Sequence, residues 1–275
     1  MRSFIFKIIK NITNLLLKFK LSRFIIFAIS EEVLNFKTKI TNSKSADEEF
    51  SFYTPNYLSR YRAKTLYTKE PDTIDWINNF KSNSTFFDIG SNVGLYSIYA
   101  AKIKNSKVYS FEPSVFNLDL LAKNIYLNEL HDKITIIPLP LNDQKKISFF
   151  NLTDINKGAA FSTFDKNYDH NGNNLSAEFK FKVAGSTLND ITKEFLIEEP
   201  DYIKIDVDGI EHLILRGSTN ILKNVRSILI EVNDDFIHQK KEIVDILIKN
   251  NFEKNINQKF STKKSIKNEI WNNKL

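Results

Sequence analysis

Apolar runs and amphipathic segments alternate along most of this chain, and their order predicts its fold. Apolar runs typical of buried strands lie at Thr85–Asp88, Lys107–Phe111, Ile134–Leu139, Tyr202–Ile205 and Ser227–Val232. Helices are expected at Asp72–Phe80, Val93–Ile103, Val115–Leu127, Ile210–Arg216 and Glu242–Asn250. Because strands that alternate with helices pair in parallel, we predict an α/β protein with a doubly wound, mostly parallel sheet.

Three segments depart from this alternation. Residues 146–184 contain short strand-like runs, Ile147–Phe150 and Phe179–Val183, around a polar stretch from Asp165 to Asn174. The tail from Phe252 to Trp271 is expected to form a closing hairpin. The polar sequence TNSKSADEE at 41–49 is interpreted as a linker. We therefore expect an N-terminal helical extension with its linker, residues 1–45, and a main domain, residues 46–275.

The N-terminal segment has the pattern of a basic amphipathic helix. Apolar residues recur at helical spacing at Ile5, Ile9, Ile12, Leu16 and Phe19, and polar ones recur on the opposite side at Lys7, Lys10, Asn14 and Lys18. Such a helix either lies on an anionic membrane surface or packs on the protein body with its lysines in solvent. No apolar run approaches the ~20 residues that span a bilayer.

Charge and composition narrow the functional classes. Residues 1–30 contain six of the 39 basic residues and none of the 33 acidic ones, so the rest of the chain is balanced. A balanced body argues against nucleic-acid binding. The absence of cysteine excludes disulfides and thiolate metal sites and fits a reducing compartment. We expect a cytoplasmic protein, peripheral at the inner membrane surface if its first 30 residues contact lipid; the sequence does not indicate its oligomeric state.

The segment FFDIGSNVGLYSIYAAKIKNSKVYSFEP, from Phe86 to Pro113, has the pattern of a nucleoside-binding unit. Asp88 and Glu112 each end an apolar run, where ligands bind in open α/β sheets. Gly90 and Gly94 flank a short turn in which the backbone can approach a ligand closely. The spacing between the two acids places Glu112 where a carboxylate accepts both hydroxyls of a ribose.

Two classes of cofactor compete for this unit. A dinucleotide site requires G-x-G-x-x-G, with the pyrophosphate at a helix N-terminus. Here Asn92 stands where the second glycine would fall, which weakens the dinucleotide interpretation. An acid before the turn suits a cofactor that has no phosphate and carries positive charge, such as S-adenosylmethionine.

A second cluster of candidate residues lies in DYIKIDVDGIEHLILRGS, from Asp201 to Ser218. Asp206 ends an apolar run and should point into the same crevice as Asp88. Asp208 could instead cap the next helix, Glu211 could favour that helix dipole, and an isolated His212 is more often structural than catalytic. We nevertheless expect the group to line an active site. We assign no metal, although Asp206, Asp208 and Glu211 offer oxygen ligands that suit Mg²⁺.

Taken together, these motifs resemble the FkbM-type family of S-adenosylmethionine-dependent methyltransferases. The resemblance covers roughly residues 52–252. Its further motifs are ITIIPLPLND, GAAFSTF, STLNDI and SILIEVN. It implies a Rossmann-like, class I methyltransferase fold with a seven-stranded sheet whose last strand is antiparallel. It also implies O-methylation, often of a sugar hydroxyl in a glycan or secondary metabolite.

The resemblance also implies roles for individual residues. The methionine moiety would lie against Asp88, Gly90, Asn92 and Gly94, the ribose against Glu112, and the adenine near Asn142 and Asp143, while Asp206, Asp208 and Glu211 match the family signature. Two positions depart from the family pattern. Asp208 stands where Glu is usual, which could shift a hydrogen bond, and Asn189 stands where Asp is more common.

The sequence thus predicts an S-adenosylmethionine-dependent O-methyltransferase acting on a glycan or nucleotide-sugar-derived acceptor. Methyl transfer to a hydroxyl benefits from a base, for which Asp206 is the first candidate and His212 the second. Glu70 is expected to close the site from the N-terminal side. The segment from Asn151 to Val183 is expected to shape the acceptor pocket, with Phe161, Phe164, Tyr168 and His170 suited to a sugar face. A non-catalytic scaffold on the same fold and a nicotinamide-dependent dehydrogenase are the alternatives.

Overall fold

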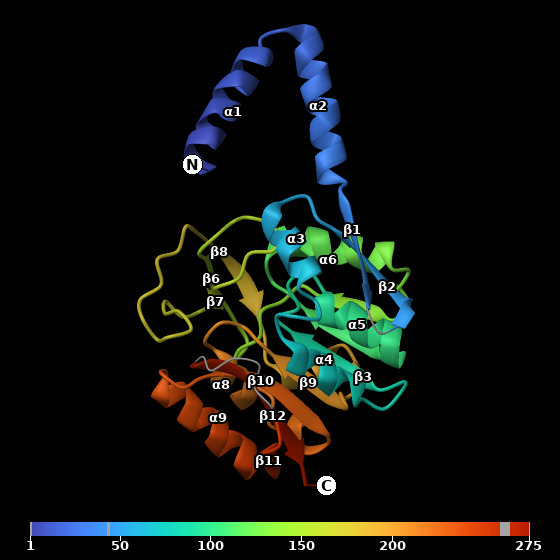
Figure 1. Cartoon of the computed structure of the whole chain (residues 1–275). Helices are drawn as coiled ribbons and strands as arrows, with labels where there is room; N and C mark the ends of the chain where they lie inside the picture. The colour runs from blue at the N-terminus through green and yellow to red at the C-terminus, as the bar shows by residue number, and fades with distance from the viewer. Residues whose placement is uncertain (1, 43–44, 259–264, 275) are drawn as a thin grey trace.

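The computed structural model describes residues 2–42, 45–258 and 265–274 of the chain (Figure 1). The helices are α1 (Arg2–Leu16), α2 (Lys20–Leu34), α3 (Tyr57–Lys64), α4 (Pro71–Asn78), α5 (Leu95–Lys104), α6 (Val115–Leu127), α7 (Leu188–Glu194), α8 (Glu211–Arg216) and α9 (Ile237–Lys249), with a 3₁₀ turn at Ile221–Lys223. The strands are β1 (Lys37–Asn42), β2 (Ser45–Tyr53), β3 (Thr85–Ile89), β4 (Lys107–Phe111), β5 (Ile134–Ile137), β6 (Lys146–Leu152), β7 (Ser162–Phe164), β8 (Phe179–Gly185), β9 (Tyr202–Ile205), β10 (Ser227–Asn233), β11 (Phe252–Lys254) and β12 (Ile266–Asn273).

The central sheet has seven strands in the order β11-β12-β10-β9-β3-β4-β5. β10, β9, β3, β4 and β5 pair in parallel, while β12 runs antiparallel to both of its neighbours. This is the doubly wound, mostly parallel seven-stranded sheet that the sequence predicts, with its last strand reversed, and it confirms the predicted fold class. The tail forms an antiparallel pair as expected, although residues 259–264 between its strands lie outside the described part.

Helices cover both faces of this sheet because side chains along each strand alternate between two cores. Phe86 of β3 packs in the core that includes residues of α4, α5 and α6. The next residue, Phe87, packs in the core that includes residues of α7, α8 and α9. Both rings are fully buried. A strand buried on both faces reads as a continuous apolar run, which is why the sequence located these strands well.

Most predicted elements are found within two residues of the expected bounds, but α9 begins five residues before Glu242. Its buried stripe contains Gln239, Ile243 and Leu247, spaced four residues apart. Gln239 occupies the first position of this stripe and donates a hydrogen bond to Glu211. Because a polar residue occupies the first buried position, the apolar pattern of the sequence did not show where the helix begins.

The linker predicted at residues 41–49 is wrong, since most of this segment belongs to the antiparallel pair β1–β2. Phe50 and Phe52 of β2 alternate into the core. The side chains of Asn124 and Asn128, on and just after α6, accept hydrogen bonds from the backbone of Tyr53 and Ser51. The expected division of the chain after residue 45 therefore falls inside a strand pair that is docked on the main body.

Residues 146–185 supply a second, three-stranded antiparallel sheet in the order β7-β6-β8. Phe150, Leu152 and Phe164 of this sheet pack against Ile210, which precedes α8, and Leu213 of α8. The short strand β7 was not predicted, because its three residues lack a strand-length pattern. The small sheet therefore packs against the segment that follows β9. This segment carries the second cluster of candidate residues.

The helices α1 and α2 project away from the rest of the protein as a pair (Figure 1). Phe4, Phe6, Leu21 and Phe24 are each at least 68% exposed, so the apolar side chains of the pair are not covered by the body. The alternative in which the N-terminal helix packs on the body is therefore not realised. Among the residues that the structure describes, no helix is long and apolar enough to cross a membrane.

Candidate active site

A cavity of about 460 Å³ opens beyond the carboxyl ends of β3, β4, β9 and β10. Six residues predicted for the site line it, namely Glu70, Gly90, Asn92, Glu112, Asp206 and Asp208. The other six, Asp88, Gly94, Asn142, Asp143, Glu211 and His212, are not among its lining residues. The structure therefore brings residues of both sequence clusters to one cavity. Some of the predicted residues line that cavity, and the others support the residues that do.

The turn after β3 is held against the end of β4 by Glu112. Its carboxylate accepts hydrogen bonds from the backbone N–H of Asn92 and of Ser114, both at 2.8 Å. Burial raises the pKa of Glu112 to about 7, although these two N–H groups oppose the shift. A carboxylate has about four acceptor positions, so this side chain can still accept hydroxyl groups from the cavity.

Asp88 and Gly94 support the turn from behind. Asp88 is 1% exposed, and its Oδ2 accepts a hydrogen bond of 2.5 Å from the Ser97 hydroxyl of α5. Burial raises the pKa of Asp88, against the lowering effects of Lys204 and Ser97. Gly94 precedes α5 with a φ of +85°, and a Cβ there would lie 2.5 Å from Leu121 Cδ1. Both residues thus fix where α5 begins.

Gly90 brings the first turn into direct contact with the end of β9. A Cβ at this position would lie 1.9 Å from the carbonyl oxygen of Asp206, and the residue has a φ of +84°. Only glycine fits both the backbone conformation and the space. This contact sets the distance between the turn and the acidic cluster.

We expect Gly90→Ala to lower the free energy of unfolding by about 3 kcal/mol, measured by urea denaturation, because strain and overlap add together. Gly158→Ala is the matched control, since Gly158 has a φ of +85° but ordinary contacts of 3.5 Å or more around an added Cβ. It should cost about 1 kcal/mol. Equal losses in the two variants would show that the contact with Asp206 is relaxed.

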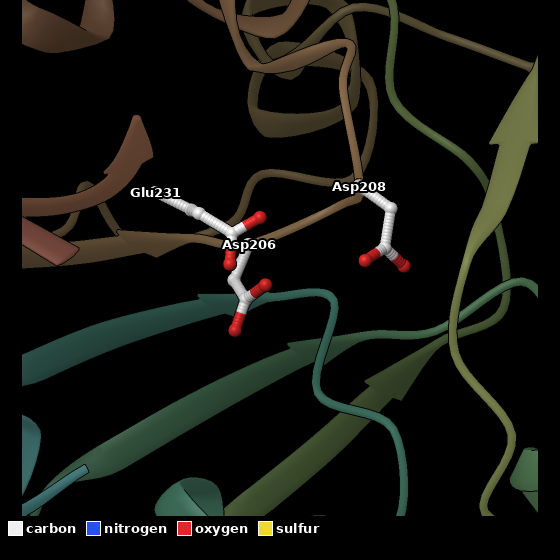
Figure 2. Close-up of side chains that lie close together, drawn as sticks. All are labelled: Asp206, Asp208 and Glu231. Carbon is white, nitrogen blue, oxygen red and sulfur yellow. The ribbon is translucent and has the colours of Figure 1, made fainter. Parts of the chain in front are cut away.

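Three carboxylates from two neighbouring strand ends gather at the base of the cavity. Figure 2 shows Asp206 and Asp208, which follow β9, close to Glu231 of β10. One ligand-type oxygen of each lies within 4.8 Å of the others. Such a set offers oxygen ligands suited to Mg²⁺, so the metal alternative considered from the sequence involves Glu231 in place of Glu211.

These three carboxyl groups have different affinities for protons. Burial opposes ionisation of Asp206, but the Lys204 and Lys69 ammonium groups hold its pKa below the usual value. Burial and the charge of Asp206 raise the pKa of Asp208 to about 6. Burial, together with Asp206 and Asp208, raises the pKa of Glu231 well above its usual value. Near neutral pH the cluster therefore holds an ionised Asp206 beside a carboxyl group that titrates close to pH 6.

Lys204 is the cation beneath this cluster. It lies on β9, is 1% exposed, and donates a hydrogen bond of 2.7 Å to Asp206 Oδ2. Its Nζ also lies 5.2 Å from the centre of the Tyr96 ring. Burial disfavours its charge, but Asp206 and Asp88 raise its pKa above the usual value. This ion pair with a buried lysine fixes the orientation of Asp206.

Glu211 and His212 do not reach the cavity. Glu211 is 1% exposed and accepts hydrogen bonds from the backbone N–H groups of Val207 and Gly209, so it shapes the loop that carries Asp208. His212 is 4% exposed, and its ring packs against Phe236 rather than the acidic cluster. Burial lowers the pKa of His212 to about 4. Its place in the fold gives no support to a role as general base.

Asn142 and Asp143 lie just beyond the cavity wall. Asn142 is fully buried, and its Oδ1 accepts a hydrogen bond from the Asp143 N–H at 2.7 Å. Asp143 forms an ion pair of 3.3 Å with Arg216 of α8. The preceding residues Leu139, Pro140 and Leu141 line the cavity instead. Asn142 and Asp143 therefore hold in place the neighbouring apolar residues that line the cavity.

Glu70, which directly precedes α4, lines the cavity. Its carboxylate accepts hydrogen bonds from Tyr96 at 2.9 Å, from Asn268 at 3.2 Å and from Lys69 at 2.6 Å. It thereby links the start of α4 to α5 and β12. Lys69 and Lys267 also line the cavity, so its wall carries positive as well as negative groups.

Sequence reasoning missed Glu231, Lys204 and the contribution of β12. Glu231 is the acid within the apolar run SILIEVN, and Lys204 is the base within DYIKID. A charged residue inside a strand that is otherwise buried was the available signal, since such groups are rarely buried unless paired. Asn268 reaches the site through strand pairing alone, for which the sequence holds no local signal.

Comparison with known proteins identifies the family. Residues 88–254 match the methyltransferase FkbM domain. The methyltransferase sdnD of Sordaria araneosa is 25% identical over 202 residues, which cover 65% of this chain and 77% of that protein. The hexuronic acid methyltransferase AglP of Haloferax volcanii is 26% identical over 161 residues, which cover 56% of this chain and 57% of that protein.

Among solved structures, the methyltransferase FkbM from Methylobacillus flagellatus KT aligns with a TM-score of 0.48 at 13% identity, over 70% of this chain and 44% of that one. The chain thus spans less than two thirds of AglP and of this solved protein. The match to the methyltransferase FkbM domain covers well over half of the chain and includes the turn after β3, the acidic cluster and β10. The chain therefore belongs to the FkbM methyltransferase family.

Proposed function

We propose that this protein is an S-adenosylmethionine-dependent O-methyltransferase that methylates a sugar hydroxyl of a glycan or nucleotide-sugar-derived acceptor. The observation that carries the proposal is the single cavity in which Glu112 and the turn after β3 face the carboxylates of Asp206 and Asp208. A binding site for the methyl donor and a site for proton removal must adjoin in such an enzyme. Membership of the FkbM family supports the same reaction class.

The residues present suit this cofactor. Glu112 offers acceptor positions to the two ribose hydroxyls, and the side chain Oδ1 of Asn92 is buried without a partner beside it. The apolar wall of Phe111, Leu139, Leu141 and Ile214 suits the face of an adenine ring. The cofactor, when bound, supplies a methyl group on a positively charged sulfur. The carboxylates around the cavity favour that charge.

The acceptor side of the cavity suits a polar, hydroxylated ligand. Glu70, Lys69, Asn268 and Lys267 line it, and Phe161 offers an aromatic face. AglP is named for methylation of a hexuronic acid, which supports a carbohydrate acceptor for this chain. Tyr168 and His170, considered from the sequence, are not among the lining residues.

In the proposed reaction a hydroxyl oxygen of the acceptor bonds to the methyl carbon as the carbon–sulfur bond breaks, and the electron pair of that bond stays on sulfur. The hydroxyl proton passes to a carboxylate of the cluster. Asp206, fixed by Lys204, orients the hydroxyl, and Asp208 takes the proton, because a base whose pKa lies close to the working pH is the more effective one. Alignment of the two reactants contributes about 7–11 kcal/mol, and the base about 10²–10⁴-fold in rate.

Two alternatives from the sequence are less well supported. A non-catalytic scaffold has no need for Asp206, Asp208 and Glu231 to converge within 4.8 Å at the cavity. A nicotinamide-dependent dehydrogenase needs a glycine where Asn92 stands. The Asn92 side chain instead donates to the Ala159 carbonyl at 2.6 Å and fills the space above the turn.

The proposal is tested by incubating the purified protein with S-adenosylmethionine labelled on its methyl group and a panel of nucleotide sugars and surface glycans. We expect label to appear in at least one carbohydrate, on an oxygen located by mass spectrometry and NMR. Saturable cofactor binding without transfer to any member of the panel would favour the scaffold. Binding of NAD in a calorimeter, without binding of S-adenosylmethionine, would favour the dehydrogenase.

A further inference from the structure

The helix pair α1–α2 presents an apolar surface that no other described part of the chain covers. No residue of α2 is buried, and Leu21, Phe24 and Ile25 on it are 74%, 71% and 48% exposed. On α1, Phe4 and Phe6 are 68% and 70% exposed. A surface of this kind on a soluble body marks a place of interaction.

The charge of the pair selects its partner. Residues 1–30 contain Arg2, Lys7, Lys10, Lys18, Lys20 and Arg23 and no acidic residue. The rest of the chain has equal numbers of acidic and basic residues. A second copy docked through the same helices would bring two positive segments together, and its body offers no net negative charge. The complementary surface is therefore an anionic one outside this protein.

The lengths of the helices define how they can meet a bilayer. α1 and α2 have 15 residues each, which corresponds to about 22 Å, shorter than the ~30 Å hydrocarbon core. The basic side chains of Lys7, Lys10 and Lys18 are exposed along with the apolar ones. A helix that lies in the bilayer interface can insert its apolar side chains at the headgroup boundary and keep its lysines at the level of the phosphates. This position suits both the apolar and the basic side chains.

We propose that α1 and α2 bind the surface of an anionic lipid bilayer and lie in its interface. The attachment of the pair gives this docking a consequence for the site. Phe36, which follows α2, is anchored by a hydrogen bond of 2.7 Å from the Thr54 N–H to its carbonyl and by the Arg60 guanidinium 5.6 Å from its ring. Arg60 lies on α3, and α3 also supplies Tyr61 and Arg62 to the cavity wall. A bilayer-bound pair therefore keeps the cavity at the membrane surface.

The test is sedimentation of the full chain with vesicles of phosphatidylcholine alone or mixed with phosphatidylglycerol. We expect binding to the anionic vesicles that weakens as salt is added, and little binding to the neutral ones. The triple variant Lys7→Gln, Lys10→Gln, Lys18→Gln should lower the partition coefficient roughly 100-fold, at about 1 kcal/mol for each cation. The matched control Lys193→Gln, Lys223→Gln, Lys249→Gln removes three exposed lysines of the body and should change it less than about threefold.

A second variant separates lipid binding from self-association. Ile5→Ser, Ile9→Ser, Ile12→Ser removes exposed apolar side chains outside the core, so the melting temperature should stay the same while vesicle binding falls. The proposal is overturned if the unmodified chain stays in solution with anionic vesicles, or binds neutral vesicles equally well. It is also overturned if analytical ultracentrifugation shows an oligomer that this variant dissociates and that excludes vesicles.

Discussion

Replacing Glu112 by alanine is expected to weaken S-adenosylmethionine binding roughly 100-fold, measured by isothermal titration calorimetry. Above pH 7, where Glu112 is ionised, its carboxylate accepts two ribose hydroxyls in the proposed complex, and each hydrogen bond to a charged acceptor contributes about 1.5 kcal/mol. Glu112→Gln keeps the shape and one acceptor oxygen, so it should lose about tenfold. Unchanged affinity in Glu112→Ala would remove the basis for placing the ribose at the end of β4.

Controls are needed because Glu112 also binds the protein itself. Its carboxylate holds the N–H groups of Asn92 and Ser114, so alanine could loosen the turn without any effect on a ribose contact. The melting temperature without cofactor reports that loosening. Glu70→Gln changes another carboxylate of the same cavity, on the acceptor side, and should alter cofactor affinity less than about threefold.

The central sheet could be predicted because its strands are buried on both faces. Apolar runs such as the one ending at Asp88 need no knowledge of partners, and their alternation with helices determines the order of layers. The pair β1–β2 could not be predicted in the same way. Much of β2 is polar, and the residues that dock it, Asn124 and Asn128, lie more than 70 positions away in the chain.

The sequence could predict which loop carries the candidate site residues. It could not predict which of their side chains point into the cavity. Asp206, Asp208, Glu211 and His212 lie close together in the sequence, yet only the two aspartates line the cavity. Direction depends on the loop backbone, in which Asp208 has a φ of +61°. Glu231 joins the cluster only because β10 pairs with β9.

Replacing Asp208 by asparagine is expected to lower kcat by about 10²–10⁴-fold while leaving cofactor affinity nearly unchanged, measured with the acceptor found in the panel. Asparagine keeps an oxygen that can accept the hydrogen bond of 2.6 Å from the Phe161 N–H, so the loop should hold its shape. Activity of Asp208→Asn within tenfold of the unmodified protein would exclude it as the base.

The pH dependence of kcat distinguishes this base from Asp206. Activity requires the ionised form of Asp208, so it should rise with pH through about 6, where that carboxyl titrates. Asp206→Asn removes a negative charge that raises the pKa of Asp208, and the rise should therefore move to lower pH.

Carbon-13 NMR of the Asp208 carboxyl gives the same titration without an acceptor, and repeating it with EDTA and with Mg²⁺ separates proton binding from metal binding. If Asp208 titrates at the same pH in Asp206→Asn, the charge of Asp206 does not affect the pKa of Asp208. Asp206 then acts through orientation of the acceptor alone.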